Sequence, residues 1–180
     1  MKKILVLYAT REGQTGKIAQ RITAHLRAQN CTVDLVNAAD KAAAALIKPE
    51  AYELLVFGAS LHAGHVEREL LDFIRDHKDG IERKDRSFFL VLLSAATKDP
   101  KARATSLDTA NRQVIGQLPV SFAEIEMIAG ALKFSKYTWP VTWIMKRIAR
   151  KSGGDTDASR DHEYTDWLQV ERYAEKLASG

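Results

Sequence analysis

The segment Ile4-Leu5-Val6-Leu7-Tyr8, followed by the loop Thr10-Arg11-Glu12-Gly13-Gln14-Thr15, decides the fold of this chain. An unbroken apolar run of this length is typical of a strand that is buried on both faces. Residues 18, 22 and 26 are apolar at helical spacing, so a helix is expected directly after the loop. The first turn of a helix leaves backbone N–H groups without partners, and its dipole favours an anion. The sequence therefore predicts a phosphate site at residues 10–15.

Two common phosphate motifs do not fit this loop. A P-loop needs Gly-x-x-x-x-Gly-Lys followed by Ser or Thr. Alignment on Gly16-Lys17 places Arg11 at the first glycine and Ile18 at the hydroxyl position. A dinucleotide loop needs three glycines, whereas this one has Gly13 and Gly16 alone. An ordinary turn rich in capping residues is the structural alternative at this point.

Composition bounds the class of protein. The 180 residues, 46% hydrophobic and 28% charged, are typical of one folded domain. The lone Cys31 cannot form an internal disulfide, which favours a reducing compartment. No apolar run approaches the roughly 20 residues of a membrane-spanning helix. Charges at Arg11 and Glu12 follow the first apolar run too soon for a signal peptide.

Strand and helix patterns alternate along the chain, with strands expected at 4–8, 32–36, 54–57, 88–93 and 125–129. The first, third and fourth are apolar throughout, as central parallel strands are, while Asp34 and Glu126 mark the other two as edges. This predicts the α/β class and a flavodoxin-like, five-stranded parallel sheet of order 2-1-3-4-5, with helices on both faces. Residues 1–180 are expected to form one domain, with an insertion at about 131–159. A ligand is expected where loops 10–15 and 60–65 meet.

Phospho-acceptor receiver domains share this strand order. They need an aspartate at the end of the third strand and acidic residues after the first. Gly58, Ala9 and Thr10 occupy these places, so the chemistry excludes a receiver.

The loop at residues 10–15 resembles the phosphate loop of flavodoxins, Thr/Ser-x-Thr-Gly-x-Thr, with Glu12 in place of the middle threonine. This resemblance implies an FMN cofactor whose phosphate lies over the first helix. Strand order alone does not decide function, because many proteins share it.

Stretches of the second half are similar to the menaquinone-dependent protoporphyrinogen oxidase family. They are Gly58-Ala59-Ser60 with Gly64-His65, Ile128-Ala129-Gly130-Ala131-Leu132, Ser152-Gly153-Gly154-Asp155-Thr156-Asp157 and Tyr164-Thr165-Asp166-Trp167. The family implies an enzyme of haem biosynthesis that oxidises protoporphyrinogen IX to protoporphyrin IX in three two-electron steps. Electrons pass through FMN to menaquinone, or to another quinone. The resemblance also implies a cytoplasmic protein attached peripherally to the inner cell membrane.

The resemblance assigns residues to the cofactor, which carries the redox chemistry. No catalytic side chain and no metal ligand is assigned. Gly58 and Gly64 are expected to allow close approach of the backbone to the flavin. His62 and His65 could both act as proton relays. The alternative is that His62 is solvated and His65 caps the next helix. Thr165 is expected to cap the last helix. The predicted FMN-binding residues are Thr10, Arg11, Glu12, Gly13, Gln14, Thr15, Ser60, Leu61, Gly64, Ser94, Ala95 and Thr97.

The segment 134–151 is basic and aromatic, and residues 127–154 contain no acidic side chain. Aromatic and basic residues at helical spacing predict an element that contacts a membrane surface or the propionates of the substrate. A helix packed on the body with a solvated basic face is the alternative. No base-reading motif supports nucleic-acid binding. The predicted contact residues are Trp139, Trp143, Lys146, Arg147, Arg150 and Lys151.

Three other functions are consistent with parts of the sequence: a flavodoxin-type electron carrier, an NAD(P)H–quinone reductase and a non-enzymatic membrane-binding module. Electron-carrier flavodoxins are typically acidic and have an aromatic residue in a flavin loop. This chain has a net charge of +4, and neither loop 60–65 nor loop 94–98 contains Trp, Tyr or Phe. Both features favour the oxidase over an electron carrier.

Overall fold

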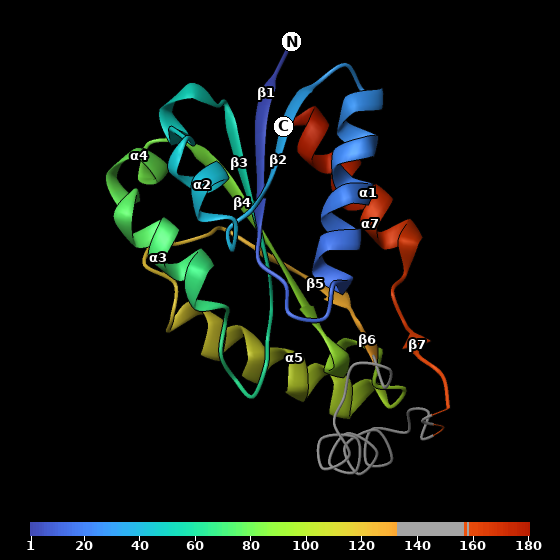
Figure 1. The fold of residues 1–180 in the computed structure, drawn as a ribbon. Coiled ribbons are helices and arrows are strands. Elements are labelled where there is room, and N and C mark those ends of the chain that lie inside the picture. The colour runs from blue at the N-terminus through green and yellow to red at the C-terminus, as the bar shows by residue number, and fades with distance from the viewer. Residues whose placement is uncertain (133–156, 158) are drawn as a thin grey trace.

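A computed structural model describes residues 1–132, 157 and 159–180 and shows a parallel sheet between two layers of helices (Figure 1). The strand order is β2-β1-β3-β4-β5, which confirms the predicted fold. The sheet strands are β1 (Lys3–Tyr8), β2 (Thr32–Asn37), β3 (Leu54–Ser60), β4 (Asp85–Leu92) and β5 (Ile125–Ala129). The helices are α1 (Gln14–Ala28), α2 (Lys41–Ala45), α3 (Arg68–Asp76), α4 (Lys78–Glu82), α5 (Pro100–Ile115) and α7 (Trp167–Ser179), with short 3-10 turns η1 (Pro49–Ala51) and η2 (Leu93–Ala96).

The apolar runs predicted as central strands are buried on both faces. Leu5 and Val6 of β1 are fully buried although they point to opposite sides of the sheet. The charged side chains on the edge strands find partners at the rim. The Tyr52 hydroxyl donates to Asp34 at 2.8 Å, and the Gln169 amide donates to Glu126 at 2.6 Å. The edges therefore accept a charge that the centre of the sheet excludes.

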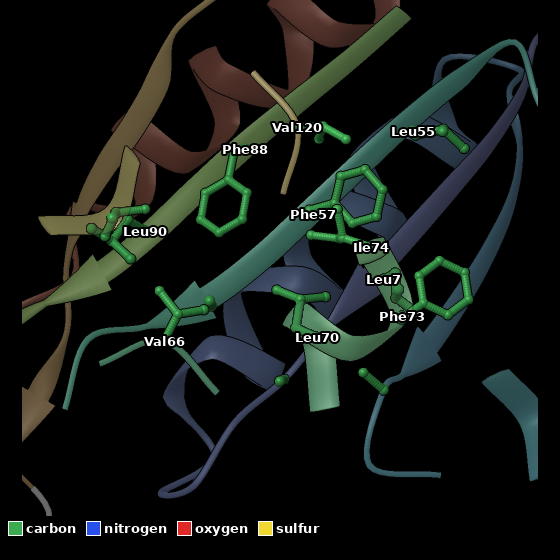
Figure 2. Close-up of a cluster of buried hydrophobic side chains, with 14 of the residues drawn as sticks. Leu7, Leu55, Phe57, Val66, Leu70, Phe73, Ile74, Phe88, Leu90 and Val120 are labelled. Carbon is green, nitrogen blue, oxygen red and sulfur yellow. The ribbon is translucent and has the colours of Figure 1, made fainter. Parts of the chain in front are cut away.

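Each face of the sheet has its own core. Helices α1 and α7 cover one face, where Ile18 and Val170 pack on the strands. Helices α2 to α5 cover the other face. Figure 2 shows Phe57 and Phe88 in this second core, with Leu70 and Ile74 from α3 and Val120 packed around them.

Some element boundaries differ from those predicted. Strand β3 continues past residue 57 because Gly58, Ala59 and Ser60 pair with β4 up to Val91. Helix α5 ends at Ile115, and Leu118, which lies beyond the helix, packs against the core. The short helix α4 was not predicted.

A small antiparallel pairing lies at the start of the predicted insertion, about 131–159, and just after its predicted end. Strand β6 (Ala131–Leu132) pairs with β7 (His162–Glu163), so the stem of the insertion lies beside the end of β5. The predicted contact residues Trp139, Trp143, Lys146, Arg147, Arg150 and Lys151 lie outside the described residues. Among the residues that the structure describes, no helix is long and apolar enough to cross a membrane.

Candidate functional site

A cavity of about 300 Å³ lies at the carboxyl ends of the central strands, where the topology predicted a ligand. The parallel register brings the ends of β1, β3, β4 and β5 to one edge of the sheet. Four segments line the cavity: Thr10, Glu12, Gln14 and Thr15; Ser60, Leu61, His62 and Ala63; Val91, Leu92 and Leu93; and Gly130 and Ala131.

The first segment presents the open N-terminus of α1 to the cavity. Gly13 has φ 94°, a conformation that glycine adopts readily, and its N–H donates to Thr10 Oγ1 at 2.9 Å. Helix α1 has no side-chain cap and no acidic residue in its first turn. Thr15 lines the cavity with 1% of its surface exposed. Free backbone donors and threonine hydroxyls at a helix start form an anion site.

The second segment is held by a buried carboxylate. Glu67 is 3% exposed and accepts the Ser60 N–H at 3.1 Å and also the Ser60 hydroxyl. Burial raises the pKa of Glu67, against the opposing effects of its hydrogen bonds with Ser60 and of nearby His62. The carboxylate thus ties the end of β3 to the start of α3, although no sequence motif pointed to Glu67.

A tight turn connects His62 and His65, which exchange two backbone hydrogen bonds of 3.0 and 2.9 Å. Ala63 and Gly64 form the turn with φ 50° and 82°. His62 lines the cavity, and burial lowers its pKa. His65 is exposed and does not cap α3, which starts after Glu67 without a side-chain cap. The expectation that His65 caps the next helix is therefore wrong, while His62 is half-buried at the cavity wall.

Gln117 supports this turn from a distance in the sequence. Its amide donates to the Gly64 carbonyl at 2.9 Å, and its oxygen accepts the Val66 N–H at 3.1 Å. This bidentate bridge fixes a loop that borders the cavity. Nothing in the local sequence around residue 117 identifies the contact.

Gly58 was expected to allow close approach of the backbone to the flavin, but the structure shows a packing reason for this glycine. A Cβ at this position would lie 2.0 Å from Cζ of Phe89, which is fully buried. The missing side chain makes room for a core aromatic ring rather than for a ligand.

Thr165 does not cap α7 as expected, because Asp166 caps this helix by accepting the backbone N–H groups of Leu168 and Gln169.

The structure brings part of the predicted FMN set to the cavity: Thr10, Glu12, Gln14, Thr15, Ser60 and Leu61. Arg11, Gly13 and Gly64 belong to the same loops but do not line it. Ser94, Ala95 and Thr97 do not line it either, and Ala95, a residue of η2, is buried in the core. Residues 91–93 and 130–131 also line the cavity but were not predicted as site residues. Their position at the ends of predicted strands was the feature of the sequence that could have identified them.

The lining fits a flavin mononucleotide. The start of α1 offers donors to a phosphate, while Leu61, Val91 and Leu92 supply apolar walls for a ring system. Oε1 of Gln14 is buried and has no hydrogen-bond partner among the described residues, so it can accept from a ligand hydroxyl.

Comparison with known proteins agrees with this geometry. A family model described as a flavodoxin domain matches residues 5–159. The crystal structure of oxidised flavodoxin 1 from Bacillus cereus superposes with a TM-score of 0.56 at 16% identity, covering 98% of this chain and 97% of that chain. The chain belongs to the flavodoxin domain family.

Curated relatives are more specific. Protoporphyrinogen IX dehydrogenase [quinone] of Escherichia coli (strain K12) is 30% identical over 178 residues, covering 98% of this chain and 94% of that protein. The enzyme of the same name from Leishmania major is 29% identical over 178 residues, covering 98% of this chain and 75% of that protein. The similarity to protoporphyrinogen-oxidising enzymes that the sequence indicated is confirmed.

Proposed function

We propose that this chain is a quinone-dependent protoporphyrinogen IX dehydrogenase of haem biosynthesis. The observation that carries the proposal is the match to relatives of that name over 98% of the chain. Protoporphyrinogen IX loses six electrons and six hydrogens in three two-electron steps, and three quinone molecules become quinols. Bound FMN supplies the two-electron redox chemistry between the two substrates.

The residues that line the cavity bind and orient the FMN. The N–H groups at the start of α1, with the hydroxyls of Thr10 and Thr15, hold the phosphate. Glu67 keeps Ser60 in place, so that loop 60–65 borders the ring. Leu61, Val91 and Leu92 exclude water from one side. Because burial lowers the pKa of His62, this side chain is neutral at pH 7 and adds no charge to the site.

The proposal extends to the identity of the quinone and to the position of the protein at the membrane. We propose menaquinone as the physiological acceptor and a peripheral position on the cytoplasmic face of the inner membrane. The six basic residues between 133 and 151, in a stretch without acidic side chains, support attraction to anionic lipid headgroups. A quinone with a long lipid tail is reached most readily by a protein at that surface.

An anaerobic assay tests the function. Purified protein is loaded with FMN and mixed with protoporphyrinogen IX and a menaquinone analogue, and porphyrin fluorescence is followed. Quinone-dependent growth of fluorescence above the spontaneous rate is expected, and omission of quinone is the control. A protein that binds FMN but gives no such growth would instead be an electron carrier or an NAD(P)H–quinone reductase. A protein that binds no flavin would contradict the FMN assignment.

A further inference from the structure

Thr165 links two walls of the cavity that are far apart in the sequence. Its hydroxyl donates to the carbonyl of Ala129, the last residue of β5, at 2.8 Å. The same oxygen accepts from the side-chain amide of Gln14, the first residue of α1, at 2.9 Å. Next to it, the Tyr164 N–H donates to the carbonyl of Gly130 at 3.0 Å. Gln14 and Gly130 both line the cavity.

Further contacts place the same segment against α1. Lys17 Nζ lies 3.2 Å from a carboxylate oxygen of Glu163, whose other oxygen accepts from the Trp167 indole at 3.0 Å. We call residues 163–165 and their contacts with α1 and the end of β5 the C-terminal clasp. It joins the start of α1 to the opposite wall.

The hydrogen bonds of Thr165 fix the orientation of Gln14. A carbonyl oxygen only accepts, so the Thr165 proton goes to Ala129. The hydroxyl oxygen then has to receive the Gln14 amide N–H, and Gln14 Oε1 is left as a buried acceptor without a partner among the described residues. Gln14 is 4% exposed, so this orientation is set by neighbours rather than by solvent.

The hydroxyl of Thr165 has no role in starting α7. Asp166 caps that helix, with bonds of 3.0 Å to the N–H of Leu168 and 3.1 Å to the N–H of Gln169. Removal of the Thr165 hydroxyl therefore leaves the helix cap intact and acts on the clasp alone.

We propose that Thr165 is a positioning residue of the cofactor site, an inference that rests on the proposed binding of FMN. Through Gln14 and Ala129 it holds the phosphate-binding start of α1 at a set spacing from the wall at residues 130–131 before the cofactor arrives. A site whose loops are already in place binds more tightly, because less order has to be created on binding. The Tyr164-Thr165-Asp166-Trp167 stretch thereby acquires a function in flavin binding.

The substitution Thr165→Val tests this role, because valine matches threonine in shape and lacks the hydroxyl. The apoprotein is titrated with FMN, and with riboflavin, which has no phosphate, and quenching of flavin fluorescence is followed. Thr165→Val is expected to weaken FMN binding about tenfold, since a buried donor and a buried acceptor lose their partner. The loss for riboflavin is expected to be smaller, because riboflavin has no phosphate for the N–H groups at the start of α1 and keeps only the hydroxyl contact with Gln14.

Two further variants serve as controls. Thr165→Ser keeps the hydroxyl and should restore FMN binding to within about twofold of the wild type. Thr109→Val removes a hydroxyl that bonds to its own helix at 2.9 Å on the exposed face of α5, and it should leave binding unchanged. Should the valine variant not fold, Thr165→Ala takes its place with the same expected direction.

A double-mutant cycle isolates the contact. Gln14→Leu and Thr165→Val are combined, and their effects on FMN affinity are expected to be clearly less than additive, since each removes the same hydrogen bond. Wild-type FMN affinity in Thr165→Val, additive effects, or equal losses for FMN and riboflavin would overturn the positioning role while leaving the proposed function intact. Absence of FMN binding by the wild type would overturn the proposed function, and with it this inference.

Discussion

The buried carboxylate of Glu67 is the most unusual single residue beside the cavity. It satisfies the backbone and the hydroxyl of Ser60 at the point where β3 ends. Burial favours its protonated form and raises its pKa, while His62 and the hydrogen bonds act in the opposite direction. A carboxylate in such a place positions the loop at the cost of a charge held away from water.

The pH dependence of stability follows from this pKa. Because the folded pKa of Glu67 is raised above the unfolded value, the folded state binds more protons in the window between the two, and stability falls as pH rises through it. In Glu67→Gln the amide oxygen can accept the Ser60 N–H while the amide N–H donates to the Ser60 hydroxyl, and the side chain does not titrate. Its stability relative to the wild type should therefore increase as pH rises from about 4.5, the ordinary glutamate value. Urea unfolding at several pH values measures this.

Glu67→Ala provides the matched control. It leaves the Ser60 N–H and hydroxyl without a buried partner and should cost roughly 1–3 kcal/mol. A constant difference between Glu67→Gln and the wild type at all pH values would contradict a raised pKa for Glu67.

At the scale of elements, an aspartate marks the start of helices α2, α5 and α7. Asp40 and Asp99 cap α2 and α5 by accepting a backbone N–H, as their side chains favour. The start of α7 was harder to predict, because Thr165 and Asp166 are both good N-caps. In the structure Asp166 caps the helix, and the Thr165 hydroxyl forms hydrogen bonds with Gln14 and Ala129 instead.

Removal of this cap should weaken α7. Asp166→Ala is expected to lower the free energy of unfolding by about 1 kcal/mol. Asp40→Ala, which removes one accepted N–H from the five-residue α2, should cost less, because α2 buries Ala44 alone whereas α7 packs Val170 and Leu177 into a core. Denaturant unfolding measures both. Faster amide exchange at Leu168 and Gln169 in Asp166→Ala would locate the effect, and unchanged exchange there would contradict it.

Over the whole molecule, the strand order places the loops that line the cavity at one edge of the sheet. The stem of the insertion, β6 with β7, emerges at the same edge (Figure 1). Among the described residues at this stem, Ala131 also lines the cavity.

Charge reversal tests the membrane proposal. The triple change Arg147→Glu, Arg150→Glu and Lys151→Glu should lower affinity for anionic vesicles at least tenfold, since each basic residue near the surface contributes about 1 kcal/mol. The control reverses the exposed Lys41, Lys78 and Arg83 around α2 and α4, for the same change in net charge. Sedimentation with vesicles of phosphatidylglycerol and phosphatidylcholine measures both. Equal losses in the two variants would indicate attraction by net charge alone.

The sequence by itself determined the class of fold, the strand order and the start of the anion site. Strands buried on both faces, such as 4–8 and 88–92, must be apolar throughout, so burial can be recognised locally. Only the tertiary structure decided which polar groups meet. Ser60 with Glu67, Gly64 with Gln117 and Gln14 with Thr165 are contacts whose partners lie up to 151 residues apart. A hydroxyl or an amide bonds to whatever the packed chain brings near it, and no local pattern records that neighbour.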